Sequence, residues 1–418
     1  MTVDMQAIGK QAKIASRQLH PFDSPAKNQV LLAIADELNL QREAILAANA
    51  IDLEEGHKNG LTTALLDRLS LQKRLDGVIR GVCDVVDLPD PVGMEFEQKT
   101  LPNGLQIRKR RVPIGVLGVI YEARPNVTVD VVALTLKTSN AVILRGGSET
   151  LRSNVALVKA IRTALEKCSF PMDAVQLVED TDRQYVYELL RLSDTVDMII
   201  PRGGNSLHTF CRENSTIPVI TGGIGICHLY VDETADLDAA LAIVHNAKTQ
   251  RPSVCNALDT LLVQDTVAAK FVPMVVQRLT EDKVRFKVDE HAAQLVNGAL
   301  NVERAGESDW DVEWLDLILG IRVVPNLDVA IKHIQAHGTA HSDGILTQDP
   351  VAMERFLNEV DSAAVYVNAS TRFTDGGQLG LGAEIAISTQ KLHARGPMGL
   401  EELTTYKWLI VGQGHVRP

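Results

Sequence analysis

From Pro113 onward, short apolar runs alternate with longer stretches of helical spacing, and this alternation strongly limits the folds open to the chain. The apolar runs are bounded by glycine, proline and polar residues, as buried strands are. Strands are predicted at 114–120, 141–144, 175–178, 196–200, 218–220, 226–231 and 260–263, with helices between them at 127–137, 149–167, 183–192, 206–213 and 237–248. Strands that alternate with helices form βαβ units, so parallel sheets in an α/β fold are expected.

The regions on either side of this block have different patterns. The first hundred residues predict helices around 26–38, 43–53 and 61–86, and Pro89, Pro91 and Gly93 then end the helical region. The turn Pro102-Asn103-Gly104 predicts a hairpin of strands 96–101 and 105–110, because Asn-Gly tolerates positive φ. Two strands alone are marginally stable, so the hairpin is expected to dock rather than stand as an isolated ribbon. The strand-like stretch 404–411 is a candidate to pair with it.

Length and composition favour a globular protein with more than one domain. The chain has 418 residues, more than a single core usually supports, and a second α/β block runs from about 236 to 373. Hydrophobic residues make up 45% and charged residues 23%. Aromatic residues are only 4%, so Ala, Val, Leu and Ile must fill the cores, as in buried parallel sheets.

Charge and cysteine usage exclude several classes. The net charge of −11 argues against general nucleic-acid binding, which needs a basic footprint. No apolar run approaches a membrane span, and the amino-terminal residues lack the pattern of a signal peptide. The cysteines are odd in number and scattered, without metal-ligand spacing: Cys83, Cys168, Cys211, Cys227 and Cys255. We therefore expect a cytoplasmic protein with reduced thiols and no bound metal.

Pairs of glycines follow three predicted strands. They occur in Arg145-Gly146-Gly147-Ser148, in Arg202-Gly203-Gly204-Asn205 and in Thr221-Gly222-Gly223. At the carboxyl end of a parallel strand, glycine lets the backbone approach a ligand, and a following helix favours anions. One such pair is usually a simple turn, but three in one block favour a nucleotide site. The G-x-G-x-x-G fingerprint is absent.

Two further residues are candidates for chemistry. Cys255 lies in a loop between the helix 237–248 and the strand 260–263. Most cysteines are inert core residues, so its position alone leaves catalysis as the less common alternative. Asn126 follows the strand 114–120 and either caps the next helix or donates its amide to a developing oxyanion. The pattern does not decide between these roles.

Longer blocks carry a resemblance to a known family. Val112–Ile120, Asn140–Arg145 and the Cys255 loop are similar to the aldehyde dehydrogenase superfamily over nearly the whole chain. Within it the sequence most resembles the γ-glutamyl phosphate reductase family, the glutamate-5-semialdehyde dehydrogenases. The specific blocks are Val119-Ile120-Tyr121-Glu122-Ala123-Arg124-Pro125-Asn126, Val367-Asn368-Ala369-Ser370-Thr371-Arg372-Phe373-Thr374-Asp375-Gly376 and Leu379-Gly380-Leu381-Gly382-Ala383-Glu384-Ile385.

The resemblance implies an aldehyde-dehydrogenase-like α/β fold of two parallel-sheet domains and a β-hairpin oligomerisation arm. The cofactor-binding domain would comprise residues 1–98 and 113–232, and the catalytic domain 233–385 with Cys255. The arm would comprise 99–112 and 386–418, and would join a dimer or tetramer.

The resemblance also implies a reaction of proline biosynthesis, in which L-glutamyl 5-phosphate is reduced to L-glutamate 5-semialdehyde with NADP(H). Cys255 would be the nucleophile that forms a thioacyl intermediate, and Asn126 with the Cys255 N–H would stabilise the oxyanion. The cofactor would be bound by Arg145, Gly146, Gly147, Ser148, Arg202, Gly203, Gly204, Gly222 and Gly223.

Other residues are weaker candidates. Arg124 and Arg372 are tentative ligands of the substrate's α-carboxylate or phosphate, with a structural role as the alternative. His341 is a weaker candidate still, and a structural role is favoured for it. A functional link to glutamate 5-kinase is a further expectation from the resemblance.

Two departures from the wider superfamily refine this interpretation. Hydrolytic relatives carry a water-activating Glu where this chain has Ile220, and an enzyme that exchanges acyl groups with phosphate needs no activated water. NAD-using relatives carry Lys-Pro-x-Glu after the cofactor strand, and an ungapped match places Arg145 at the Lys and Ser148 at the Glu. Loss of a carboxylate and gain of a guanidinium would favour the 2′-phosphate of NADPH.

Two rival functions remain at this stage. A CoA-acylating aldehyde dehydrogenase also needs no water-activating Glu, and it differs from the main hypothesis in depending on CoA rather than phosphate. A catalytically silent nucleotide-binding relative would be indifferent to loss of Cys255.

Overall fold

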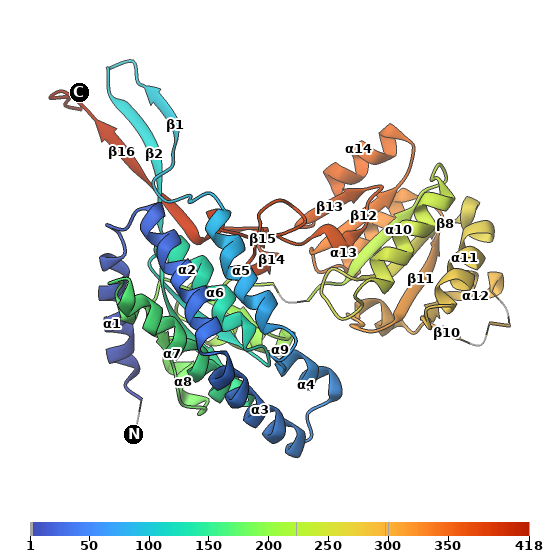
Figure 1. The fold of residues 1–418 in the computed structure, drawn as a ribbon. Helices are drawn as coiled ribbons and strands as arrows, with labels where there is room; N and C mark the ends of the chain where they lie inside the picture. The colour runs from blue at the N-terminus through green and yellow to red at the C-terminus, as the bar shows by residue number, and fades with distance from the viewer. Residues whose placement is uncertain (1–2, 223, 297, 300, 418) are drawn as a thin grey trace. The chain divides into compact units, whose positions relative to one another are not determined.

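The computed structural model of this chain describes residues 3–222, 224–296, 298–299 and 301–417. The chain forms two compact units (Figure 1). Unit 1 comprises Met1–Thr221, Gly380–Ala386 and Met398–Pro418, and unit 2 comprises Gly222–Leu379 and Ile387–Pro397. None of the described helices is long and apolar enough to span a membrane.

Unit 1 is built on a parallel sheet with the strand order β5-β4-β3-β6. The strands are β3 (Val116–Tyr121), β4 (Ala141–Gly146), β5 (Val175–Leu177) and β6 (Met198–Arg202). The connecting helices are α6 (Asn126–Lys137), α7 (Leu151–Lys167) and α8 (Gln184–Leu189), and α9 (Asn205–Asn214) follows β6. This order confirms the predicted βαβ alternation.

Five helices precede this sheet in the chain. They are α1 (Met5–Gln18), α2 (Ser24–Leu40), α3 (Arg42–Lys58), α4 (Thr63–Leu69) and α5 (Leu75–Asp87). The predicted helix over 61–86 is therefore two helices rather than one. The reason lies in α3, where the buried amide of Asn49 donates to the carbonyl oxygen of Leu69 at 2.9 Å and accepts the N–H of Leu71 at 2.9 Å. These bonds satisfy the backbone where α4 ends, so the chain can turn there.

The predicted hairpin and its partner strand are confirmed. The hairpin consists of β1 (Glu95–Thr100) and β2 (Gln106–Pro113), with Gly104 at a φ of +91° in the turn. The late strand β16 (Thr404–Val411) pairs antiparallel with β2 over its whole length, and the strands lie side by side in Figure 1. The third strand gives the hairpin the support that two strands lack.

One predicted strand does not form. Of residues 218–220, only Val219 makes a β-bridge, to Ile199. Pro218 has no N–H to donate, and the chain continues after Ile220 as Thr221-Gly222-Gly223, which disfavours a regular strand. The segment still makes two backbone bonds near the start of β6, from the Ile199 N–H to Pro218 and from the Ile220 N–H to Ile199.

Unit 2 is built on a second parallel sheet with the strand order β10-β9-β11-β8-β7-β12-β13. The strands are β7 (Cys227–Val231), β8 (Leu258–Gln264), β9 (Arg285–Val288), β10 (Val302–Arg304), β11 (Ile318–Val324), β12 (Ser342–Leu346) and β13 (Ala364–Val367). The helices are α10 (Leu237–Thr249), α11 (Asp265–Thr280), α12 (Glu290–Leu295), α13 (Leu327–His337) and α14 (Pro350–Glu359). Short strands β14 (Ala386–Ser388) and β15 (Gly396–Met398) pair with each other.

Both faces of the unit 2 sheet are buried. On β7, Leu229 and Val231 join a core with α10, α11 and α12, whereas Tyr230 between them joins a core with α13 and α14. The same alternation occurs on β8. Burial on both faces explains the continuous apolar runs in the sequence and confirms the predicted α/β class.

Asn140 ties together three parts of unit 1. This buried residue accepts the Gly115 N–H at 2.8 Å and donates to the carbonyl oxygen of Leu403 at 2.8 Å, just before β16. We predict that Asn140→Ala lowers the free energy of unfolding by about 2–4 kcal/mol, because the buried carbonyl group of Leu403 and the partly buried N–H of Gly115 each lose a partner. Chemical denaturation followed by circular dichroism measures this change.

The control is Asn39→Ala on the exposed side of α2, which should change the free energy of unfolding by less than about 0.5 kcal/mol. Equal effects of the two substitutions would contradict the role of Asn140.

Candidate functional site

The Cys255 loop joins α10 to β8 in unit 2. Cys255 is half-buried, and the next residue, Asn256, is buried. The Asn256 amide donates to the carbonyl oxygen of Thr374 at 2.9 Å, and the Thr371 hydroxyl donates to the Asn256 carbonyl oxygen at 2.7 Å. The stretch 367–376, one of the blocks that carry the family resemblance, therefore lies against the loop and bonds to it.

Gly225, just before β7, packs directly against the backbone of Cys255. A Cβ atom on residue 225 would lie 1.6 Å from the Cys255 carbonyl oxygen, which is possible for glycine only. The same carbonyl oxygen accepts a bond from the thiol of Cys227 at 3.2 Å. The nucleophile candidate is thus fixed through its own backbone by the start of the neighbouring strand.

A buried polar cluster lies beneath this loop. The imidazole of His341 is 4.0 Å from the Cys227 sulfur and 2.8 Å from the Ser342 hydroxyl, which in turn is 2.6 Å from the Thr374 hydroxyl. Burial lowers the pKa of His341 to about 4, so the ring is neutral at physiological pH. His341 therefore packs as an uncharged residue of this cluster.

Glu313 is a residue of this region that the sequence did not single out. Its Oε1 accepts the Gly225 N–H at 2.9 Å, and burial raises the pKa of its carboxyl group. The contact joins residues 88 positions apart, so no local sequence pattern predicts it. A carboxylate consequently lies next to the glycine that contacts Cys255.

Arg372 is held against the same loop. Its Nε donates to the Gln250 side chain at 2.9 Å, and its carbonyl oxygen accepts a bond from the Asn256 amide at 3.4 Å. Unit 2 thus brings this predicted substrate residue together with Cys255. The other tentative substrate residue, Arg124, is an exposed residue of unit 1.

The predicted cofactor residues of unit 1 lie where β4 and β6 end. A chain of hydrogen bonds runs from the Tyr121 hydroxyl to Thr128 at 2.6 Å, from Thr128 to Asn154 at 2.9 Å and from Asn154 to Thr150 at 2.9 Å. A Cβ atom on Gly146 would lie 2.2 Å from the Asn154 amide nitrogen. Gly146 is therefore required by this buried chain, which fixes the turn before α7.

Two carboxylates belong to the same turns. Glu149 accepts the Ala123 N–H at 2.6 Å and lies against Gly147, and Glu122 accepts the Gly204 N–H at 3.2 Å and lies against Gly203. The turn therefore does contain a carboxylate, although Ser148 itself supplies none. The structure places the Glu149 side chain, one residue later, at this turn.

The two predicted cofactor arginines have partners within unit 1. The buried Arg145 donates to the carbonyl oxygens of Gly146 and of Thr181, the latter at 2.8 Å. Burial lowers the pKa of Arg145. Arg202 lies near enough to Asp130 to lower the pKa of that carboxyl group, although burial outweighs this and raises the pKa.

Asn126 does not cap a helix. Pro125 occupies the cap position, and Asn126 is the first residue of α6. Its Nδ2 donates to the carboxylate of Asp130, one turn later, at 2.9 Å. The capping alternative is therefore wrong, and the amide is held by a carboxylate that the sequence did not single out.

Only Gly222 of the third glycine pair is among the described residues. A Cβ atom on Gly222 would lie 2.0 Å from the Ile387 carbonyl oxygen in β14, so close backbone packing requires glycine there. Gly223 lies outside the residues that the structure describes.

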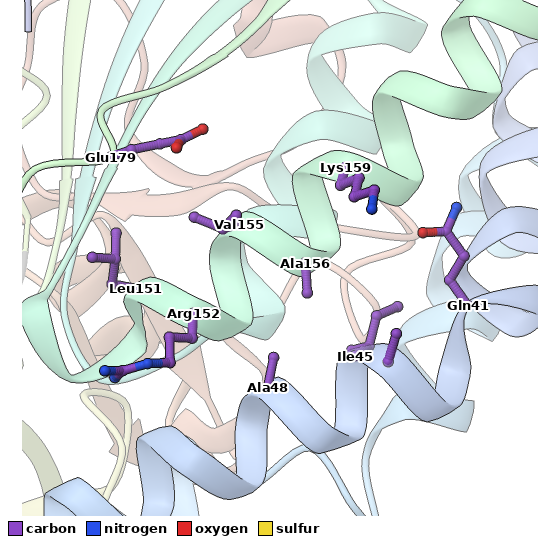
Figure 2. A pocket seen from close by; sticks show the side chains of 10 residues that line it. Gln41, Ile45, Ala48, Leu151, Arg152, Val155, Ala156, Lys159 and Glu179 are labelled. Atoms are coloured by element: carbon purple, nitrogen blue, oxygen red, sulfur yellow. The ribbon is translucent and has the colours of Figure 1, made fainter. Parts of the chain in front are cut away.

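A pocket of about 440 Å³ lies between α3 and α7 of unit 1 (Figure 2). Ala48 and Ile45 of α3 and Ala156 of α7 give it an apolar floor, with polar groups at its edge. One of these, Arg152, is ion-paired with Glu55. None of the predicted site residues lines this pocket.

Comparisons with known proteins agree with these geometries. The aldehyde dehydrogenase family matches residues 2–305. A γ-glutamyl phosphate reductase from Vibrio parahaemolyticus is 57% identical over 97% of this chain and 98% of its own length. The chain belongs to the γ-glutamyl phosphate reductases of the aldehyde dehydrogenase family.

Solved structures extend the comparison. The γ-glutamyl phosphate reductase from Thermotoga maritima is 46% identical, with a TM-score of 0.97 over 99% of this chain and 100% of its own. An engineered glycolyl-CoA reductase with bound NADP⁺ has a TM-score of 0.68 over 97% of this chain and 96% of its own, at 16% identity, and so shares the fold. The aldehyde-dehydrogenase-like fold and the enzyme class, an oxidoreductase acting on aldehyde groups, are confirmed.

The close packing of Gly225 against Cys255 predicts how Gly225→Ala would affect activity. Gly225→Ala must displace the Cys255 carbonyl group, because the added Cβ overlaps a backbone atom. We expect kcat to fall about 100-fold, as a displacement of about 1 Å at a reacting group can cause. The rate at which iodoacetamide alkylates Cys255 should fall together with kcat.

Gly306→Ala provides the matched control in unit 2. Its nearest neighbour would be the Asp309 carboxylate at 3.9 Å, so kcat and the alkylation rate should stay as in the wild type. A Gly225→Ala protein with unchanged kcat would contradict the packing argument.

Proposed function

We propose that this protein reduces L-glutamyl 5-phosphate to L-glutamate 5-semialdehyde and phosphate with NADPH, as a cytoplasmic step of proline biosynthesis. The identity of 57% over nearly the whole chain to a γ-glutamyl phosphate reductase carries this proposal. The fixed backbone of the Cys255 loop supports it, since a nucleophile must be held in position to react.

In the proposed first step, the Cys255 thiolate attacks the acyl carbon of the substrate. The bond between this carbon and the phosphate oxygen then breaks, phosphate leaves with the electron pair, and a thioester forms on Cys255. The Asn126 amide and the Cys255 N–H are proposed to donate to the oxyanion. The bond from Asn126 to Asp130 supports this role, because it uses one amide hydrogen and orients the other.

The turns of unit 1 fit a dinucleotide in two ways. The carboxylates of Glu122 and Glu149 are acceptors suited to ribose hydroxyl groups. At the amino end of α9 the cap residue Gly204 has no side chain to bond the first N–H groups of the helix, which are suited to a phosphate, while the Gly204 N–H itself is bound by Glu122. When bound, the nicotinamide group supplies the hydride that reduces the thioester. The resulting thiohemiacetal then collapses, which releases the aldehyde and returns the Cys255 thiolate.

Ile220 supports phosphate rather than water as the partner of the thioester. It is a buried apolar residue at the position where hydrolytic relatives carry a base. Glu313 is the nearby carboxylate that must be considered instead, but its oxygen is bound to the Gly225 N–H. The buried Ile220 thus supports phosphate exchange without hydrolysis.

The three-stranded sheet of β1, β2 and β16 is proposed as an oligomerisation arm. Its outer strand carries exposed apolar side chains, among them Trp408 at 48% and Ile410 at 64% exposure. Contiguous exposed apolar residues of this kind mark interaction surfaces. A functional link to glutamate 5-kinase, which would supply the unstable acyl phosphate, is part of the same proposal.

The reverse reaction tests the proposed function. We predict that oxidation of glutamate semialdehyde, followed by NADPH absorbance, depends on inorganic phosphate and that Cys255→Ser abolishes it. Dependence on CoA instead of phosphate would favour an acylating dehydrogenase. Oxidation with neither would indicate a hydrolytic enzyme, and activity that persists in Cys255→Ser would overturn the mechanism.

The cofactor preference is tested at Arg145. If its guanidinium binds a 2′-phosphate, Arg145→Ala should raise KM for NADPH by about 10-fold or more and leave KM for NADH unchanged, as expected for loss of a charged hydrogen bond. The bonds of Arg145 to Gly146 and Thr181 raise the alternative that its role is structural. A purely structural Arg145 would weaken use of both cofactors equally.

A further inference from the structure

Unit 2 places two arginines at the Cys255 loop. Arg372 is tied to this loop by its Nε bond to Gln250 at 2.9 Å and by the bond from Asn256 to its carbonyl oxygen at 3.4 Å. Arg251 directly follows Gln250 and is exposed. Both arginines therefore belong to the same short stretch of surface as the nucleophile.

The charges of this stretch are unfavourable for the protein alone. Burial lowers the pKa of Arg372, and the nearby positive charge of Arg251 lowers it further. Asp375 and the sulfur of Cys255 act in the opposite direction on the same pKa. The pKa of Arg372 stays lowered in spite of Asp375, so a further anion near the two arginines would stabilise their charges.

We propose that Arg251 and Arg372 bind the phosphoryl group of the acyl phosphate. This inference rests on the proposed function and names the residues that set its substrate class. As the carbon–oxygen bond breaks, the leaving phosphate gains negative charge, and the two guanidinium groups stabilise it. In the reverse direction they hold inorganic phosphate while its oxygen attacks the thioester on Cys255.

The chemistry of the anion favours phosphate over the α-carboxylate of the substrate. A carboxylate is a monoanion that one arginine can bind with both of its oxygens. A phosphate group carries up to two charges at neutral pH and three acceptor oxygens, which matches two guanidinium groups. The site must also lie beside the acyl carbon, and the bonds of Arg372 to Gln250 and Asn256 hold this arginine against the loop that carries Cys255.

Arg251→Ala is the informative variant, because Arg372 also supports the loop through Gln250. In semialdehyde oxidation by the full-length protein, we expect KM for inorganic phosphate to rise about 10- to 100-fold, with KM for the semialdehyde within about 2-fold, as for loss of one charged hydrogen-bond partner. Arg372→Lys, which keeps the charge but not the planar fork, should raise KM for phosphate as well. The control is Arg285→Ala, an exposed arginine on β9 ion-paired with Asp316.

A second measurement does not depend on turnover. Inorganic phosphate should slow the alkylation of Cys255 by iodoacetamide in the wild type, and a higher phosphate concentration should be needed in Arg251→Ala. A rise in KM for the semialdehyde alone would assign these arginines to the α-carboxylate and overturn the proposal. Unchanged constants and unchanged protection would also overturn it.

The two proposals can fail separately. If wild-type oxidation needs no phosphate, but phosphate still protects Cys255 through Arg251, the anion site stands and the proposed function is wrong. If oxidation needs phosphate and Arg251→Ala behaves as the wild type, the function stands and the anion site is wrong.

Discussion

The carbonyl oxygen of Cys255 occupies the space that a side chain on residue 225 would need. A Cβ there would lie 1.6 Å from this oxygen, so only glycine lets the loop approach the start of β7. This close approach determines the surroundings of the loop. It brings the Cys227 thiol to the same oxygen, and the Gly225 N–H that faces Glu313 belongs to the same contact. Backbone packing therefore helps to position the proposed nucleophile.

Neutral and charged side chains lie on different sides of this loop. The polar groups beneath it are neutral, since burial lowers the pKa of His341 and raises that of Cys227. The charged groups lie at its edge, in Arg251 and Arg372. Uncharged groups beneath the loop and arginines at its edge suit a reaction in which an anion leaves from one side of the proposed nucleophile. In unit 1 the turns after the strands carry carboxylates instead, which suit hydroxyl groups.

Local patterns predicted much of this fold. The Asn103-Gly104 turn and the alternation of apolar strands with helices are properties of neighbouring residues, and both were confirmed. The break between α4 and α5 was missed because it depends on Asn49, about 20 residues away in α3. The glycine pairs were predicted to form a nucleotide site, which stays a prediction, and the structure adds packing reasons for two of them: Gly146 makes room for Asn154, and Gly222 for a backbone carbonyl of β14.

The site was predicted less completely than the fold. Cys255 and Asn126 stood out through the family resemblance, whereas Glu313 and Arg251 depend on contacts that no local spacing encodes. Asp130 lies four residues after Asn126 in the same helix, so its bond to Asn126 could have been predicted from helical spacing. Ser148 was paired with a family glutamate by an ungapped match, but a shift of one residue places Glu149 at the turn. Long-range contacts and the exact alignment of single residues could therefore not be predicted from the sequence.

The central claim is that an acyl group is held on Cys255 until phosphate removes it. Mass spectrometry of the protein mixed with glutamate semialdehyde and NADP⁺, without phosphate, tests this directly. The account predicts a glutamyl adduct on the peptide that contains Cys255, stable in water and lost within seconds after phosphate is added. An adduct on another residue, or one that water removes as fast as phosphate does, would contradict it.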